Sequence, residues 1–217
     1  MKKFLIPLVC GLLGLSACQV EDTYYITNCQ DIVTIVGGEL TNGAVVFNVV
    51  QKASDNLPAF VEGERYLITF DVLNRQLDIL LKDVLPGLVT PATQTEEEIT
   101  EVQDPVILAF SILGPKYLDL GLSFYKSKKS DFAHTFSLKY SYDSTLKVLN
   151  LYLIHQGNHE NPVEMDQKEL ETGSVFLCIP IEDWPNLRKI ILHADVVSTN
   201  SEGVRSIIKR EYAGGEE

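Results

Sequence analysis

Apolar and polar residues alternate with a period of two along much of this chain. The alternation is clearest in residues 68–72, 118–124 and 136–140. A period of two places every second side chain on one face of a β-strand, so we expect these segments to be half-buried strands. Residues 44–50 and 174–181 are almost continuously apolar and are bounded by turn residues, which is typical of strands buried on both faces.

Turn residues separate the apolar segments, and no long stretch shows the 3.6-residue period of a helix. The pattern therefore predicts an all-β fold, with antiparallel strands because the connections are short. The expected strands are residues 24–36, 44–52, 65–73 and 77–85, followed by 105–113, 117–126, 134–142, 148–156, 174–181, 188–198 and 204–210, all with approximate ends.

A polar segment with several prolines interrupts the strands between Pro86 and Asp104, and it includes the acidic run 95–98. Segments of this composition commonly link domains. We expect a small β-barrel over residues 24–90, a linker over 91–104 and a β-sandwich over 105–211, because these two architectures close or cover strand edges. Residues 212–217, rich in glycine and glutamate, are expected to form a flexible tail.

The N-terminus has the pattern of a bacterial lipoprotein signal. Lys2 and Lys3 precede an apolar run over residues 4–14, which is too short to span a bilayer, and Leu15-Ser16-Ala17-Cys18 follows. This tetrapeptide resembles the lipobox, in which the cysteine receives diacylglycerol before cleavage. We therefore expect residues 1–17 to be removed, Cys18 to carry lipid and residues 18–23 to form a tether. The alternative is an ordinary signal peptide with a coincidental cysteine.

Charge narrows the choice of partners. Without Lys2 and Lys3 the chain has 16 basic and 30 acidic residues, a formal charge of −14. Such a chain repels phosphate backbones, so nucleic acid is not an expected partner, and the membrane is contacted through the N-terminal lipid. Glu21 and Asp22 resemble the export signal of surface-exposed lipoproteins in Bacteroidetes, although a solvated tether has the same composition. The expected location is the cell envelope at the outer membrane, on either the periplasmic face or the cell surface.

Cysteine and histidine positions give little evidence for chemistry. Cys29 and Cys178 could pair in an oxidising compartment, but Cys178 lies in an apolar strand, where a thiol packs as a small hydrophobe. His155 and His159 are four residues apart, yet a Gly-Asn turn separates them, so we expect a structural role for His155 and no metal site with Glu160. His134 begins a strand, and His193 shares a face with Asp195, which fits exposed cross-strand roles.

No catalytic residues or cofactors are expected. The serines lack a Gly-x-Ser-x-Gly context, so a hydrolase has little support. The acidic runs 95–101 and 160–171 lack the alternation of a calcium loop and are expected to be solvated. Trp184, the single tryptophan, either closes one end of the sandwich core, which we favour, or stacks on a sugar ring as a ligand contact. Tyr24 and Tyr25 either belong to a contact surface or begin the first strand.

Several segments together resemble the NigD-like lipoproteins of Bacteroidetes. The resemblance lies in Lys82-Asp83-Val84, the acidic linker, Asp104-Pro105-Val106, residues 117–120 and residues 151–155 with the turn that follows. It implies an OB-like N-terminal barrel and an immunoglobulin-like β-sandwich. The family takes its name from a bacteriocin locus, where an immunity role was proposed, and no catalytic residues are defined that could be carried over. This sequence departs from the pattern in that its fifth barrel strand is hard to place.

Two functions remain open at this point. The first is a non-catalytic, envelope-anchored lipoprotein that binds an envelope protein or a secreted protein such as a toxin, with a role in bacteriocin immunity. The alternative is a glycan-binding accessory lipoprotein at the cell surface, suggested by Trp184 and the tyrosines.

Overall fold

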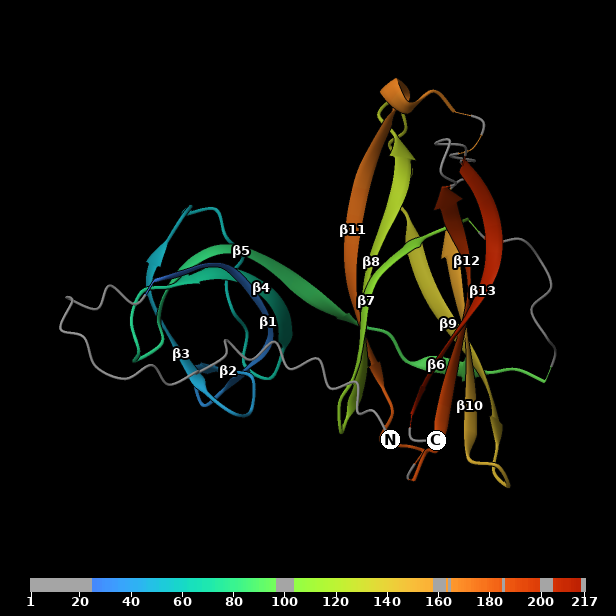
Figure 1. Ribbon diagram of the computed structural model, residues 1–217, viewed down its shortest axis with the longest axis horizontal. Helices are drawn as coiled ribbons and strands as arrows, with labels where there is room; N and C mark the ends of the chain where they lie inside the picture. Colours follow the sequence, from blue (N-terminus) through green and yellow to red (C-terminus); the bar gives the residue numbers. More distant parts are fainter. Residues whose placement is uncertain are drawn as a thin grey trace, which may run out of the picture. The chain divides into compact units, whose positions relative to one another are not determined.

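The computed structural model describes residues 25–96, 104–157, 163, 165–184, 186–199 and 205–215. These residues form β-strands and one short 3₁₀ helix, η1 (Gln167–Glu169), so the prediction of an all-β fold is confirmed (Figure 1). The chain divides into two compact units between Gly87 and Leu88. Within the described residues, no helix has the length and apolar character needed to cross a membrane.

The first unit is a closed five-stranded barrel. Its strand order is β3-β2-β1-β4-β5, and β3 closes the barrel by pairing with β5 in parallel. This is the OB-like barrel that the sequence predicts, and in a closed barrel no edge is left unpaired. The strands are β1 (Ile26–Val36), β2 (Glu39–Thr41), β3 (Val46–Lys52), β4 (Arg65–Val72) and β5 (Asp78–Val89), the last of which ends in the second unit.

The strand that was hard to place is β2, which has three residues and pairs with both β1 and β3. With three residues, β2 is too short to show the period-two alternation that identifies a strand in a sequence. The turn before it needs two glycines, since Gly37 has a φ of 62° and Gly38 a φ of 82°. The Glu62 carboxylate accepts hydrogen bonds from both glycine N–H groups, at 2.7 and 3.0 Å, and so holds the β1–β2 turn in place.

The barrel interior is filled by alternate residues of its strands. Val33, Ile68 and Ile79 are completely buried, and Phe47 meets Phe70 edge to face with ring centroids 5.1 Å apart. Burying one such side chain stabilises the fold by about 2 kcal/mol. The apolar residues that alternate in residues 68–72 are therefore the ones that face the barrel interior.

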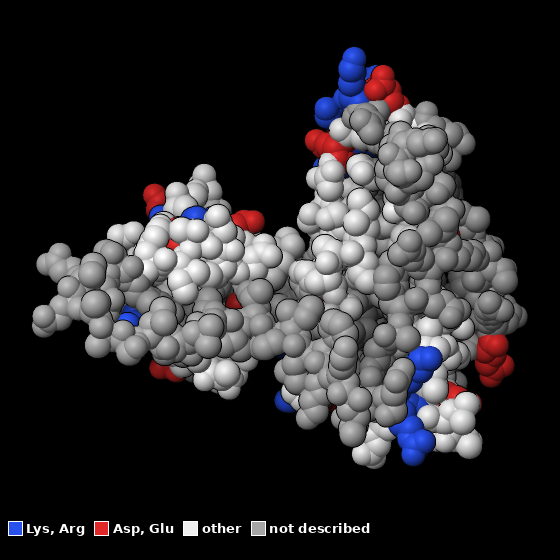
Figure 2. Space-filling view, viewed as in Figure 1, with Lys and Arg blue, Asp and Glu red and all other residues white. Residues whose placement is uncertain are grey.

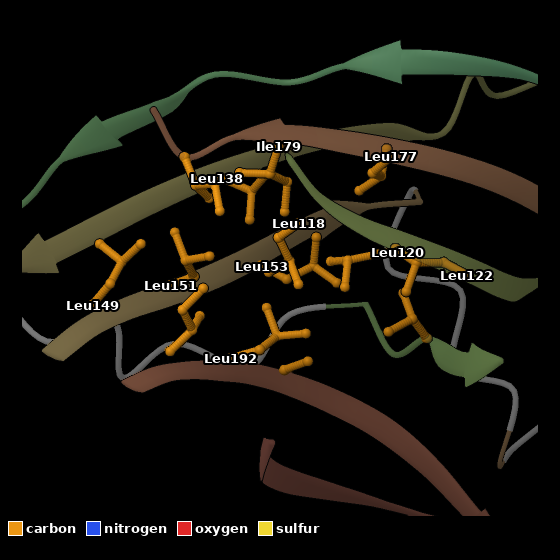
Figure 3. Packing of buried hydrophobic residues seen from close by; sticks show 14 of the residues in the cluster. Leu118, Leu120, Leu122, Leu138, Leu149, Leu151, Leu153, Leu177, Ile179 and Leu192 are labelled. Carbon is orange, nitrogen blue, oxygen red and sulfur yellow. The ribbon is translucent and has the colours of Figure 1, made fainter. Parts of the chain in front are cut away.

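The second unit is a two-layer β-sandwich. One sheet has the order β11-β8-β7, with β5 as the neighbour of β11 on its other side, and the other sheet has the order β13-β12-β10-β9-β6. The strands are β6 (Ala92–Gln94), β7 (Ile107–Leu113), β8 (Tyr117–Ser127), β9 (Thr135–Asp143), β10 (Val148–Gln156), β11 (Leu170–Pro180), β12 (Lys189–Thr199) and β13 (Arg205–Gly215). Figure 3 shows leucines of both layers meeting between the sheets, among them Leu120, Leu151 and Leu192.

Three features differ from the sequence-based expectations. The expected linker, residues 91–104, contains β6, which pairs with β9 in parallel. The expected flexible tail begins at residue 212, whereas β13 continues to Gly215, with Tyr212 opposite Leu192. Strands β10 and β12 are parallel, because the chain crosses to the other sheet as β11 before it returns. Short connections make consecutive strands antiparallel, but they do not fix strands that are separated by a crossover.

Candidate functional site

Two histidines come together at one end of the sandwich. His155 lies near the end of β10, on the same face as the buried residues Leu149, Leu151 and Leu153, and His134 directly precedes β9. The antiparallel pairing of β9 with β10 places His155 opposite Phe136, two residues after His134. The two imidazoles are stacked, with ring centroids 5.2 Å apart. His134 Nδ1 is 2.9 Å from His155 Nε2. The two histidines are 21 residues apart in the sequence, and only the strand register brings them together.

The protonation of the pair follows from its hydrogen bonds. His155 Nδ1 is 3.0 Å from the backbone oxygen of Asp104, which can only accept, so Nδ1 carries the hydrogen. Nε2 of a neutral His155 then accepts a hydrogen bond from Nδ1–H of His134. Burial lowers the pKa of His155, which is only 3% exposed, and favours this neutral form.

Aromatic rings form the walls around the pair. The Phe136 ring is parallel to the His155 ring, with centroids 4.6 Å apart. Phe124 lies 4.5 Å from His134 and 5.2 Å from His155, centroid to centroid, and Phe132 approaches His134 from its edge. Apolar walls of this kind remove water from the imidazoles, which is the cause of the lowered pKa of His155.

Two glycines provide the space that the rings occupy. A Cβ on Gly157 would lie 2.6 Å from Nδ1 of His134. A Cβ on Gly173 would lie 2.5 Å from Cζ of Phe124, its cross-strand partner on β8. Side chains at either position would therefore displace a ring of the cluster.

The pair also fixes the segment that leads into β7. The β10–β12 pairing ends at Tyr152 and His193, and residues 104–106 continue beside the ends of both strands. Asp104 N donates to His155 O at 3.2 Å, and Val106 N donates to Asp195 O at 2.9 Å. The Asp104 carboxylate accepts a hydrogen bond from Gly157 N. His155 is thus a structural connection between β10 and the start of β7.

The cluster offers limited chemistry. Hydrogen bonds run from His134 through His155 to the backbone carbonyl of Asp104, an acceptor that is not a nucleophile. No group of three or more His, Cys, Asp or Glu side chains that could hold a metal ion occurs among the described residues. His159 and Glu160, considered with His155 from the sequence, lie outside the described residues.

The second notable feature of this unit is the strand that the histidine pair leads into. β7 is the last strand of its sheet, and from Pro105 to Pro115 the sequence contains no charged residue. Ile112 and Leu113 expose 49% and 46% of their surface. Figure 2 shows one group of charged side chains around η1 and the neighbouring ends of β8 and β11. There, Lys129 pairs with Glu169 and Lys126 with Glu171, so this part of the acidic run 160–171 is solvated ion-pair surface.

The barrel contains a buried carboxylate, Asp71, that no sequence pattern indicates. Asp71, 2% exposed, accepts hydrogen bonds from the Tyr25 hydroxyl and from Asn28 N, both at 2.8 Å, and forms an ion pair with Lys82 at 2.7 Å. Lys82 lowers the pKa of Asp71 most strongly. Asn28 has a φ of 55° at a β-bulge, which turns its N–H toward the carboxylate. Tyr25 directly precedes β1, is 54% exposed and is joined to the barrel through Asp71, and Tyr24 lies outside the described residues.

The other residues considered from the sequence, which are Trp184, His193, Asp195 and the two described cysteines, pack against neighbouring side chains or are buried. Trp184 packs against the sandwich core and meets Tyr140 edge to face at 4.8 Å, which fits a plug at the end of the core. His193 stacks on Tyr152 and approaches Asn150 Oδ1 at 3.2 Å, while Asp195 is buried, so these two are less exposed than expected. Cys29 is buried in the barrel core and Cys178 in β11. Cys18 lies outside the described residues.

The fold is shared with solved structures from Bacteroides. A NigD-like immunity protein from Bacteroides caccae aligns with a TM-score of 0.55 and 18% identity, over 87% of this chain and 98% of its own. A protein of unknown function from Bacteroides vulgatus aligns with a TM-score of 0.54 and 14% identity, over 87% and 90% of the chains. A candidate lipoprotein from Bacteroides fragilis has a TM-score of 0.50, 16% identity and coverage of 85% and 96%.

These similarities confirm, at the level of fold, the resemblance seen in the sequence. No family profile and no curated protein matches the sequence. At these identities the shared fold carries no functional assignment by itself.

Proposed function

We propose that this chain is a lipid-anchored protein of the cell envelope that binds a protein partner and catalyses no reaction. The observation that carries the proposal is the structural role of His155, which is hydrogen-bonded to the backbone of Asp104 just before β7. His155 Nδ1 donates to the backbone oxygen of Asp104 and His155 O accepts from Asp104 N, so the histidine supports the segment that enters β7. The exposed and uncharged part of β7 is suited to contacts with another protein.

The anchor and the fold support the same function. Leu15-Ser16-Ala17-Cys18 supplies a lipidation signal, and acyl chains on Cys18 would hold the two β units at a membrane. One structure of the same fold is named an immunity protein and another a candidate lipoprotein. We infer that the partner is an envelope protein or a secreted toxin, and that neutralising a bacteriocin is the specific form of this role.

Two experiments test the proposal. Cells that produce the Cys18→Ser variant should lose incorporation of labelled palmitate into the protein and should release it from the outer-membrane fraction. Retention of the variant in that fraction would show that the chain is anchored in another way. In the second experiment, a strain that lacks the protein is exposed to medium from sibling strains that secrete bacteriocins. The immunity role requires that the strain becomes more sensitive, and normal tolerance would exclude it.

A further inference from the structure

The two sheets of the sandwich have edges of very different character. β6, at one edge, has three residues, and β13, at another, contains Arg205, Lys209, Arg210 and Glu211 in its sequence. Short strands and charged residues are the usual protection of sheet edges against pairing with other chains. β7 has seven residues and no charge, so it lacks both forms of protection.

The part of β7 that can receive another strand is its second half. The first half is irregular, because the β7–β8 register shifts between Leu108 and Phe110, and Val106 is bridged to Val196 of β12. From Phe110 to Leu113 the pairing with β8 is regular. Among the described strands β8 is the only strand-pairing partner of this half, so no described strand pairs with its outer edge.

The register places the exposed side chains of this half on both faces of the sheet. Ile112 lies opposite Asp119, and Leu113 lies opposite Leu118 of the inner face. An extended segment paired with this edge would therefore find an apolar neighbour on each face, which favours apolar side chains at its own paired positions.

Charge decides between a second copy of the chain and a different protein. The chain carries a formal charge of −12, or −14 after removal of the signal. Pairing two copies would bring two acidic bodies together, whereas a segment with basic flanks would be attracted to one. The edge itself contributes no charge, so charged side chains in the paired part of the occupant would find no counter-charge there.

We propose that the outer edge of β7 at residues 110–113 receives, as an added strand, an extended uncharged segment that is flanked by basic residues and belongs to another protein. This inference rests on the proposed function and names the surface and the chemistry of the partner. The two exposed apolar residues supply side-chain contacts, and the backbone supplies the hydrogen bonds of strand addition.

A designed peptide tests the inference without knowledge of the natural partner. The probe is a fluorescent peptide of alternating valine and threonine with two lysines at each end, titrated with the chain from Gln19 to Glu217 and followed by anisotropy. Two further peptides carry a proline in the middle or glutamates at the ends.

The protein variants are Ile112→Lys and Ser111→Lys at the edge, with Leu146→Lys as the control. Leu146 is 60% exposed and lies in the β9–β10 turn, far along the chain from β7. Circular dichroism shows that each protein variant keeps its β-structure, and the melting temperature shows that it is folded.

We expect the lysine-flanked peptide to bind, and both edge variants to weaken it by about tenfold or more, while Leu146→Lys leaves it unchanged. Proline should abolish binding because it removes a backbone donor, and glutamate flanks should weaken it.

The inference is overturned if the peptide does not bind, or if the edge variants bind like the wild type. A wild-type dimer that Ile112→Lys converts to a monomer would assign the edge to a second copy and would also contradict it. A natural partner that is captured equally by wild type and Ile112→Lys would leave the proposed function standing and remove only this surface.

Discussion

His134 Nδ1 lies 2.9 Å from His155 Nε2, and with His155 neutral the hydrogen bond runs from His134 Nδ1–H to His155 Nε2. The second nitrogen of His155 is already committed to the backbone oxygen of Asp104. Protonation of His155 would therefore place a positive charge inside an apolar site and would require His134 Nδ1 to act as an acceptor instead of a donor. The same residue that connects β10 with the start of β7 is thus sensitive to acid.

The first prediction concerns the pH dependence of stability. Burial lowers the pKa of His155 in the folded chain below its usual value of about 6.5, so the unfolded chain binds more protons below that pH. The free energy of unfolding should have its full value above about pH 6.5. It should decrease as the pH falls below this value and through the pKa of His155 in the folded chain. Urea unfolding at about pH 8 and about pH 5.5 measures the decrease.

Variants at two histidines separate this effect from other titrations. His155→Gln should lose most of the decrease, whereas His193→Gln, which lies outside the cluster, should retain it. If His155→Gln loses as much stability on acidification as the wild type, the histidine pair is not the origin of the effect.

The second prediction concerns Gly157. A Cβ at this position would lie 2.6 Å from His134 Nδ1, so Gly157→Ala must displace the imidazole or the backbone. We expect a loss of about 1–3 kcal/mol in the free energy of unfolding, measured in urea. Gly114→Ala is the matched control, because its Cβ would meet only the backbone oxygen of Tyr117, at 3.4 Å. Equal stabilities of the two variants would show that the cluster tolerates the additional methyl group.

The third prediction concerns Asp71 and Lys82. Lys82 lowers the pKa of the Asp71 carboxyl, so the stabilisation is present above the unfolded value of about 3.9 and is lost as pH falls through the folded value. Lys82→Met should therefore be less stable than the wild type at neutral pH, and the difference should shrink below about pH 3.9. Lys116→Met removes an exposed pair with Glu182 and should change stability little. A difference for Lys82→Met that does not depend on pH would contradict this account.

The fourth prediction distinguishes a plug from a sugar contact at Trp184. The indole packs against the sandwich core and Tyr140, so Trp184→Ala should lower the free energy of unfolding by about 2–4 kcal/mol. Leu146→Ala, at an exposed position, should have almost no effect. Retention on immobilised glycans is measured in parallel. A variant with unchanged stability and lost glycan retention would favour the glycan-binding alternative.

The strands could be predicted because their alternation reflects a real inside and outside. Leu149, Leu151, Leu153 and His155 alternate in the sequence, and all four are buried on one face of β10. The barrel-plus-sandwich architecture followed from strand number, turn positions and the resemblance, and the shared fold confirms it.

The contacts between distant residues could not be predicted, because they depend on register. His134 and His155 are 21 residues apart, and Asp71 is joined to Asn28 through a bulge that no period reveals. β2 is too short to show a pattern, and β13 contains glycines and charges that are unusual in a strand. In these cases pairing with neighbouring strands overrides the local composition.

The most direct test of partner binding is photo-crosslinking on intact cells. A photoreactive amino acid replaces Ile112 in one lipid-anchored variant and Leu146 in another, and the adducts are separated by mass and identified. Binding of a partner at β7 predicts one discrete adduct with a different protein from position 112 and none from position 146. No adduct at position 112, or the same adducts from both positions, would contradict the claim that the anchored chain holds a protein partner at this edge.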